Sequence, residues 1–242
     1  MITRHSLFSL AIATAAVPAA ACQTTESDSV LTSGMYAQIS ATATGTGETT
    51  VAATLYLGDP SKLNFIDLEG DDQLIAHHEG QSKVMSESIL LNIVSHTATF
   101  PADNEGDTFE VEFQRAVDAG APSTLVSLPA PFTLGTVPPN VSRAAAFGVN
   151  WTGPSLTPGD RMRWSAEGPC IELAGGAITG DPGSVTVPAN TFKKKAGDNV
   201  PDSCQVKVTV TRERDGDLDR AYGKGGTALG FQARSVTYTS TP

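Results

Sequence analysis

Apolar and polar residues alternate with a period of two along most of the chain after residue 33. Six such stretches are predicted to be strands: residues 35–43, 51–57, 109–113, 147–151, 162–166 and 206–210. This alternation buries one face of a strand and leaves the other in water, as in antiparallel sheets. Helical periodicity is scarce. Short strands separated by glycine, proline and aspartate turns predict an all-β protein built from sandwiches.

Three short blocks in the first half of the chain recur in the same order in the second half. The matched blocks are residues 70–74 with 159–162, residues 97–103 with 184–190, and residues 109–115 with 206–212. Two copies of one β-sandwich unit explain these matches, and chance similarity between short strands is the alternative. We therefore expect a tandem repeat of one fold.

The prolines between residues 128 and 139 mark the predicted boundary between the two units. Proline donates no backbone hydrogen bond and favours extended backbone, so this stretch suits a stiff connector. We predict two tandem antiparallel β-sandwich domains of immunoglobulin-like type, at residues 33–130 and 131–242. Residues 33–130 contain 14 acidic and 3 basic residues, against 10 and 12 in residues 131–242, so the first domain is the acidic one.

The first 21 residues have the features of an export signal. Arg4 and His5 form a short basic region, residues 7–17 are apolar, and residues 19–21 are small. The apolar run is about half of the ~20 residues that a membrane-spanning helix needs. Residues 1–21 are therefore predicted to be a cleaved signal peptide.

Cys22 follows three alanines, an arrangement that resembles the lipobox of bacterial lipoproteins, although Ala19 stands where that motif prefers leucine. In this interpretation Cys22 carries diacylglyceryl and palmitate chains, and residues 22–32 form a polar tether. Gln23 is not the aspartate that retains many lipoproteins on the inner membrane. The resemblance thus implies an outer-membrane protein facing the periplasm or the cell surface. The alternative is cleavage by ordinary signal peptidase, which releases a soluble secreted protein.

The remaining two cysteines are a predicted disulfide pair. If Cys22 is lipidated, Cys170 and Cys204 are the two cysteines that remain, so no unpaired thiol is left over. An oxidising periplasm permits a bond between them. Two buried free cysteines are the alternative. A zinc site has less support, because neither residue has a second cysteine or a histidine at ligand spacing.

Two short aspartate-rich loops are candidate calcium sites, because calcium binds six to eight oxygen atoms. The candidate ligands are Asp103, Asp107, Asp215, Asp217 and Asp219. Neither loop matches an EF-hand, and aspartate and glycine are also ordinary turn residues, so hairpin turns are the alternative. We predict no cofactor, and no metal beyond these candidates.

A glycine-rich loop at residues 216–226 precedes the last expected strand, residues 229–239. Arg212, Arg214 and Arg234 flank this loop, and we expect them to pair with its aspartates. If the loop is structural, replacement of Asp217 by alanine lowers the melting temperature. If the loop binds a partner, that replacement leaves stability unchanged and removes an interaction.

The chain carries no familiar catalytic signature. It has no G-x-S-x-G elbow, no H-E-x-x-H, no P-loop and no dinucleotide-binding fingerprint. His77 and His78 are adjacent, so on a strand they point to opposite faces, and His96 lies on another predicted strand. We expect satisfied or surface histidines and no enzyme; a triad or metal site around one of them is the alternative. The net charge of −10 gives nucleic-acid binding little support.

The C-terminal third resembles exported lipoproteins of Gram-negative bacteria. The similarity is carried by residues 212–219, 223–226, 232–236 and 240–242, and it extends back to residues 129–132. It implies a lipoprotein and no particular activity. The resemblance to immunoglobulin-like sandwiches is architectural, because Trp164 precedes both cysteines and Asp202 occupies the tyrosine-corner position.

We expect a membrane-tethered envelope lipoprotein that acts as a non-catalytic binding or structural module. Its partners are expected to be the membrane, through the N-terminal lipid, and an envelope protein. The alternatives are an envelope enzyme whose site is assembled from distant residues, and a subunit of an envelope assembly with exposed strand edges. Only 6% of residues are aromatic, which weakens the case for a carbohydrate-binding platform.

Overall fold

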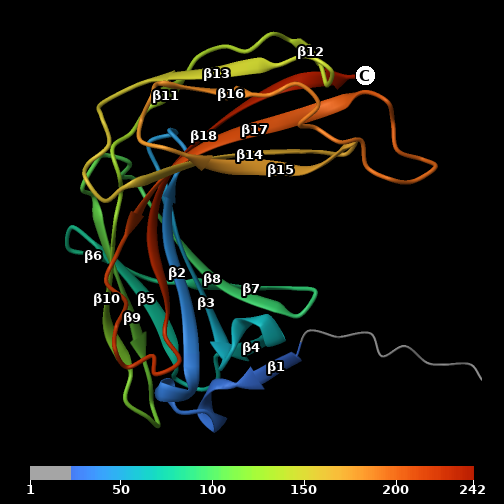
Figure 1. Ribbon diagram of the computed structural model, residues 1–242. Coiled ribbons are helices and arrows are strands. Elements are labelled where there is room, and N and C mark those ends of the chain that lie inside the picture. The colour runs from blue at the N-terminus through green and yellow to red at the C-terminus, as the bar shows by residue number, and fades with distance from the viewer. Residues whose placement is uncertain (1–22) are drawn as a thin grey trace, which may run out of the picture.

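The computed structural model describes residues 23–242 and shows an all-β protein, as predicted (Figure 1). The predicted signal peptide and Cys22 lie outside the described residues. Beside its strands, the described chain has three short 3-10 turns, at Ser27–Ser29, Thr32–Gly34 and Pro60–Lys62. The strands form two sandwich modules, one stacked across the end of the other.

The first module has the strand arrangement of an immunoglobulin-like sandwich. One sheet has the order β2-β3-β8-β7, and the facing sheet has the order β10-β9-β5-β6. These orders correspond to strands A-B-E-D and G-F-C-C′ of that fold. Their bounds are Met35–Ala43 (β2), Thr49–Leu57 (β3), Gln73–His78 (β5), Gln81–Val84 (β6), Ser86–Leu90 (β7), Ile93–Phe100 (β8), Thr108–Gln114 (β9) and Ala121–Ser127 (β10).

The second module repeats this arrangement. A small sheet has the order β11-β13-β16, and the facing sheet has the order β18-β17-β14-β15, with β12 parallel to β18. The sequence therefore encodes two sandwiches of one type, as predicted. Their bounds are Thr133–Leu134 (β11), Asn140–Ser142 (β12), Phe147–Thr152 (β13), Arg161–Gly168 (β14), Ile171–Ile178 (β15), Ser184–Val187 (β16), Cys204–Asp215 (β17) and Gly226–Thr241 (β18).

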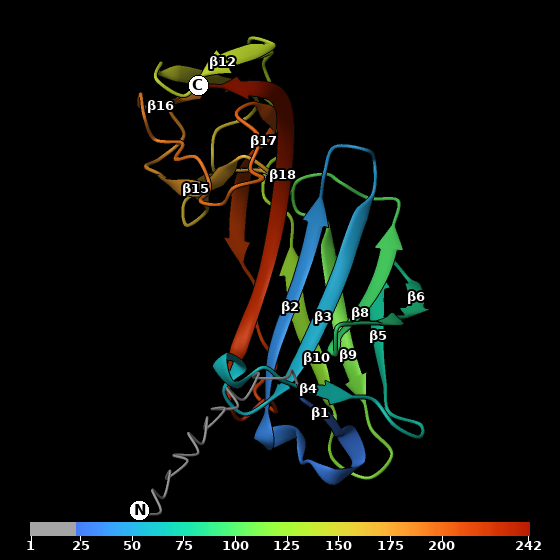
Figure 2. The same ribbon diagram turned by 90° about the vertical axis from the view of Figure 1, so that its right-hand side faces the viewer.

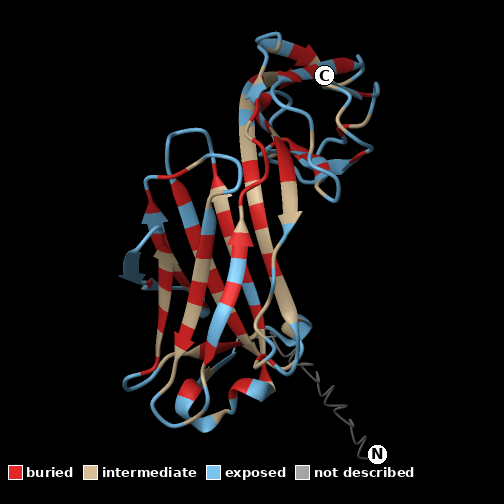
Figure 3. Cartoon of the chain, turned by 90° about the vertical axis from the view of Figure 1, so that its left-hand side faces the viewer, coloured by how far each residue is buried: buried red, intermediate tan, exposed pale blue. Residues whose placement is uncertain are grey.

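Period-two alternation builds a separate core in each module. Figure 3 shows buried and exposed residues alternating along the strands of the first module. Phe100, Phe109 and Phe113 lie in the first core, whereas Val149 and Tyr238 lie in the second. Each core is the ordinary result of two sheets packed through their apolar faces.

Strand β18 belongs to both modules. It pairs antiparallel with β17 from Cys204↔Ser240 to Asp215↔Leu229 and parallel with β2 over residues 226–232. One eleven-stranded sheet, called the long sheet below, thus runs through both modules (Figure 2). The boundary predicted after residue 130 is corrected in one respect: residues 218–228 return to the first module, where Tyr222 and Ala228 join its core.

The tether predicted at residues 22–32 is wrong for residues 23–32. Strand β1 (Gln23–Glu26) pairs parallel with β4 (Asn64–Asp67) at the edge of the long sheet. The fully buried Arg115 side chain donates hydrogen bonds to the carbonyl oxygens of Ser27 and Val30 at 2.5 and 2.8 Å. The backbone of this segment caps a buried arginine, a role that its polar composition does not reveal.

The sequence repeat reappears as a repeated ion pair. Arg115 binds Asp72 at 2.9 Å in the first module, and Arg214 binds Asp160 at 2.8 Å in the second. Strand register places Gln73 opposite Gln114 and Arg161 opposite Glu213, so the two pairs occupy equivalent positions. The sequence match of residues 109–115 with 206–212 is therefore offset by two residues, since it aligns Arg115 with Arg212. The match of residues 70–74 with 159–162 is offset by one, since it aligns Asp71 with Asp160.

Arginines and a glutamine fill the junction between the modules. Arg212 donates to the carbonyl oxygens of Ala130 and Pro154 at 3.0 and 2.9 Å, and to Asp181 at 2.6 Å. Arg214 donates to the carbonyl of Leu128, and Gln232 to that of Asp103. The expected pairing of Arg212, Arg214 and Arg234 with the loop aspartates is therefore wrong. Arg212 and Arg214 instead bind backbone carbonyls of the proline-rich connector, and Arg234 donates to the backbone carbonyl of Ala43.

Candidate functional site

The outer face of the long sheet is the largest continuous feature that both modules share. Along β18 the even-numbered residues face the two cores, and the odd-numbered residues face outward. The outer face continues on β2, β3, β14 and β17. We define it by Tyr36, Gln38, Ser40, Thr54, Tyr56, Arg161, Arg163, Thr211, Glu213, Thr227, Leu229 and Phe231.

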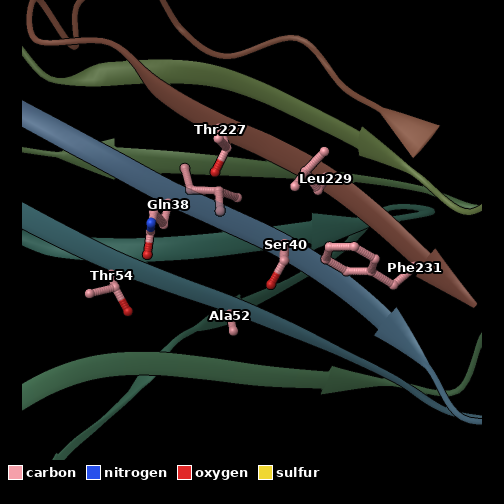
Figure 4. A pocket seen from close by; sticks show the side chains of 8 residues that line it. Gln38, Ser40, Ala52, Thr54, Thr227, Leu229 and Phe231 are labelled. Atoms are coloured by element: carbon pink, nitrogen blue, oxygen red, sulfur yellow. The ribbon is translucent and has the colours of Figure 1, made fainter. Parts of the chain in front are cut away.

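A shallow hollow of about 280 Å³ lies in this face where β3, β2 and β18 run side by side (Figure 4). Its lining combines neutral polar side chains with apolar ones and contains no titratable group. The lining residues are Gln38, Ile39, Ser40, Ala52, Thr54, Thr227, Leu229 and Phe231. The hollow can therefore offer hydrogen bonds and apolar contact, but no charge.

Two tyrosines lie on the outer face beside Gln38 and Thr54, which line the hollow. Tyr36 and Tyr56 are directly opposite in register, with their ring centroids 6.2 Å apart. The Tyr56 hydroxyl donates to the Gln38 side-chain oxygen at 2.9 Å. Burial, and then the nearby Tyr36, raise the pKa of Tyr56, so this hydroxyl keeps its proton. The hydrogen bond uses the amide oxygen of Gln38 and leaves its amide nitrogen as a donor for a ligand.

Phe231 lines the hollow and connects it to the second module. The Arg163 guanidinium lies 5.6 Å from the Phe231 ring centroid and also pairs with Glu213. Two further hollows, of about 490 and 400 Å³, adjoin Arg163 on β14 and β15. Phe231 is opposite Thr42 in register, six residues along β2 from Tyr36. At about 3.3 Å per residue, the aromatic groups are about 20 Å apart.

The histidines lie apart from this face. His77 is half-buried on β5, within 2.8 Å of the Ser82 hydroxyl and 3.3 Å of a Glu112 carboxylate oxygen. His78 is buried on the opposite side of the same strand, as the alternation of strand side chains predicts. His96 is buried on β8, with its Nε2 3.4 Å from the Glu87 carboxylate.

The surroundings of His96 are the strongest argument for an enzyme. Burial lowers the pKa of His96, while burial and the neighbouring carboxylates of Asp67 and Glu69 raise the pKa of Glu87. Both groups line a hollow of about 220 Å³ with Asp72, Gln73 and apolar residues. These lining residues supply acid and base groups but no nucleophilic hydroxyl or thiol.

The calcium candidates do not form an oxygen cage in either loop. Asp103 accepts from the Gly47 amide at 3.0 Å, and Asp215 pairs with Arg161 at 2.6 Å. Asp219 accepts from the amides of Ser123 and Ala221, each at 2.8 Å. Asp217 is exposed, and its backbone pairs with Leu125. Asp107 accepts from the Asn104 amide at 2.8 Å. Four of the five carboxylates thus already bind amides or arginine, which matches the hairpin-turn alternative.

The predicted disulfide is present. Cys170 and Cys204 are bonded, with their Cα atoms 5.7 Å apart. Cys170 lies in the turn between β14 and β15, and Cys204 begins β17, so the bond joins elements of one sheet. Antibody domains instead bridge their two sheets, which agrees with the expected departure from that pattern.

An exposed apolar tip ends the β7–β8 hairpin and was not predicted from sequence. Leu90 and Leu91 are 70% and 82% exposed, and Ile89 and Ile93 are exposed beside them. Leu91 and Asn92 form a two-residue turn with positive φ values of 52° and 63°. The alternation of apolar and polar residues is weak in residues 86–93, so the sequence did not predict strand β7.

No helix among residues 23–242 is long and apolar enough to cross a membrane. No protein-family model and no curated protein matches the chain.

Solved structures similar to this chain include murine CEACAM1b, with 6% identity over 84% of this chain and 99% of that one, at a TM-score of 0.20. Bovine butyrophilin has 11% identity over 84% and 97%, also at a TM-score of 0.20. With TM-scores this low, the strand pairing described above is what establishes the immunoglobulin-like architecture.

Proposed function

We propose that this chain is a membrane-tethered protein of the cell envelope that acts as a non-catalytic binding module through the outer face of the long sheet. One observation carries the proposal: the outward residues of β18 run without interruption from the uncharged hollow, at Thr227 and Leu229, to Phe231 and Arg163 at the second module. A surface shared by two modules through one continuous sheet suits an extended ligand.

The ligand class that fits this face is a neutral, hydroxyl-rich polymer, that is, a polysaccharide. Sugar hydroxyls match the hydroxyl and amide groups of Gln38, Ser40 and Thr54, which line the hollow. Sugar rings pack against aromatic faces such as those of Tyr56, beside the hollow, and Phe231, which lines it. The low aromatic content argued against such a platform, yet these few rings lie on one face.

Two observations support tethering: the N-terminal sequence and the position of strand β1 in the first module. Strand β1 lies at the end of the first module that is remote from the second (Figure 2). A lipid on Cys22 would hold the first module at the membrane and present β14 and β15 away from it. Replacement of Cys22 by alanine should move the protein from the membrane fraction to the soluble fraction of exported protein. Unchanged fractionation would overturn the tether and leave the binding proposal standing.

Binding is tested by affinity electrophoresis of the full chain in native gels that contain neutral polysaccharides. The wild-type chain should be retarded by at least one polysaccharide, and Phe231→Ala should lose most of that retardation. Val117→Ser is the matched control, because Val117 is 68% exposed in the loop between β9 and β10, outside the outer face. Equal retardation of wild type and Phe231→Ala, or no retardation at all, would contradict the proposal.

The apolar hairpin tip favours a second candidate function, that of an assembly subunit. All five residues of β7 are exposed, and its only strand partner among residues 23–242 is β8, so its other edge is free. A second copy of this chain could pair with that edge and cover Leu90 and Leu91. Light scattering after size exclusion should then show a dimer that Leu90→Ser reduces to monomer. A wild-type chain that stays monomeric at every concentration would exclude this candidate.

A further inference from the structure

Three potential metal ligands converge at the tip of the β5–β6 hairpin. His78 ends β5, Glu79 lies in the turn that follows, and Asp107 directly precedes β9. One ligand atom from each lies within 4.8 Å of the others, and His78 Nε2 is 3.9 Å from a Glu79 carboxylate oxygen. The set is independent of the outer face, because it involves the opposite sheet of the first module.

The hydrogen bond of His78 fixes which ring nitrogen can bind a metal. Nδ1 lies 3.0 Å from the carbonyl oxygen of Thr108. A carbonyl only accepts, so Nδ1 carries the hydrogen, and Nε2 of the neutral ring has a free lone pair. The side chain is 5% exposed and stacks on Phe109 at 4.7 Å, so its orientation is fixed. Nε2 lies 3.9 Å from a Glu79 carboxylate oxygen, beyond hydrogen-bond distance, so its lone pair is available to a cation held between the two side chains.

The carboxylates complete the set. One oxygen of Asp107 accepts from the Asn104 amide, which orients the group and leaves its second oxygen for a cation. The Glu79 side chain is 79% exposed and can rotate toward His78. Metal-binding histidines commonly donate their second nitrogen to a backbone carbonyl, and ligating carboxylates are themselves hydrogen-bonded. Both features are present here.

We propose that His78, Glu79 and Asp107 bind a divalent transition-metal cation, for which Zn²⁺ is the best probe. One imidazole and two carboxylates are a zinc-type donor set, whereas calcium prefers oxygen ligands alone. Tetrahedral zinc with ligands at about 2.0 Å requires ligand atoms about 3.3 Å apart, so Glu79 has to close the present gap. Three protein ligands leave one position for water. The cation would join the β5–β6 hairpin to the turn before β9.

The backbone at Glu79 supplies a variant that separates metal binding from folding. Glu79 and Gly80 form a two-residue turn with φ values of 45° and 78°. Asparagine is favoured over glutamate at such a position. Glu79→Asn should therefore fold at least as well as wild type while it removes one ligand. Asp107→Asn preserves an acceptor for the Asn104 amide and removes the second charge.

The test is isothermal titration of the full chain, purified without a polyhistidine tag, with Zn²⁺, together with the visible spectrum of the Co²⁺ form. We expect one bound Zn²⁺, a higher melting temperature that chelator reverses, and an affinity at least 10-fold lower in Glu79→Asn and in Asp107→Asn. Glu87→Gln is the matched control, since it alters the other buried histidine–carboxylate pair, at His96, and should leave binding unchanged. Absence of Zn²⁺ binding, or binding that survives both substitutions together, would overturn the proposal.

Discussion

Arg212 is fully buried between the modules, where its guanidinium binds Asp181, the backbone carbonyl of Ala130 in the connector and that of Pro154. Burial lowers its pKa, and Asp181 opposes that effect, so the group stays charged. Such a cation needs every one of its partners, because an unpaired buried charge is costly. The arginine thus ties the connector to the long sheet.

Replacement of Arg212 by alanine should lower the free energy of unfolding by about 3 to 5 kcal/mol, because it leaves the Asp181 carboxylate without its cation and several carbonyls without their donor. Urea denaturation of the purified chain measures this loss. Arg161→Ala is the control: it removes an exposed ion pair with Asp215 and should cost no more than about 1 kcal/mol. Similar losses in the two variants would show that the junction is not held in this way.

His96 makes the stability of the first module sensitive to acid. Its pKa is lowered in the folded state, so between its ordinary value near 6.5 and that lower value the unfolded chain binds more protons. The His96 contribution to stability is therefore complete above pH 7 and is lost as the pH falls through 6.5. Glu87 acts oppositely, since its raised pKa favours folding at low pH and loses that contribution as the pH rises through the raised value.

His96→Phe should flatten the fall in melting temperature between pH 7 and pH 5.5, while His77→Gln should leave that fall unchanged, because His77 is half-buried at the surface. Thermal melts across this pH range decide the matter. If both variants keep the wild-type profile, His96 is not the group responsible.

The β7–β8 hairpin keeps an unfavourable turn at its tip. Leucine at positive φ costs roughly 1 to 2 kcal/mol, and asparagine tolerates this region far better. Leu91→Asn should therefore raise the free energy of unfolding by about 1 kcal/mol. Guanidinium denaturation measures the gain, and Leu31→Asn controls for the loss of an exposed leucine elsewhere. A destabilised Leu91→Asn would mean that the turn does not have this conformation in solution.

The loop before β18 depends on Asp219 more than on Asp217, the residue considered in the structural alternative for this loop. Asp219 accepts from two backbone amides, whereas Asp217 is exposed and contributes only its backbone. Asp219→Ala should cost about 1 to 2 kcal/mol of stability, and Asp217→Ala close to none. Differential scanning calorimetry of both variants tests this order, and the reverse order would contradict the loop geometry.

The alternation of apolar and polar residues predicted where the strands lie, but it did not predict which strands pair with one another. All six alternating stretches are strands, because each buries one face in its own module. The last strand was expected at residues 229–239 and covers Gly226–Thr241. Its parallel pairing with β2 joins residues about 190 positions apart and leaves no trace in either segment. Gln232 and Arg234 interrupt the apolar alternation because they lie at the polar junction.

The candidate sites divide in the same way. The disulfide was predictable, because the expected lipidation of Cys22 leaves two of the three cysteines and hence one pairing. The outer face was not, since Gln38, Tyr56 and Phe231 come from three strands whose neighbours only the tertiary structure defines. His78 and Asp107 were each noted in the sequence, but nothing in their spacing shows that a hairpin brings them together.

At the scale of the whole molecule, β18 makes two sandwiches into one continuous surface. The proposed polysaccharide contact depends on that continuity, because the hollow lies in the first module and Arg163 lies in the second. The junction arginines support it by fixing the connector. The hairpin tip and the proposed metal site belong to the first module alone, so each can be altered without loss of the shared face.

Hydrogen–deuterium exchange of the full chain, with and without the polysaccharide that retards it most, tests the central claim directly. The outer face of the long sheet is predicted to gain protection, with the largest changes in β2 around Gln38 and in β18 around Phe231. The facing sheet of the first module, β10-β9-β5-β6, should be unchanged. Protection confined to that facing sheet, or spread equally over both, would contradict the assignment of the outer face as the binding surface.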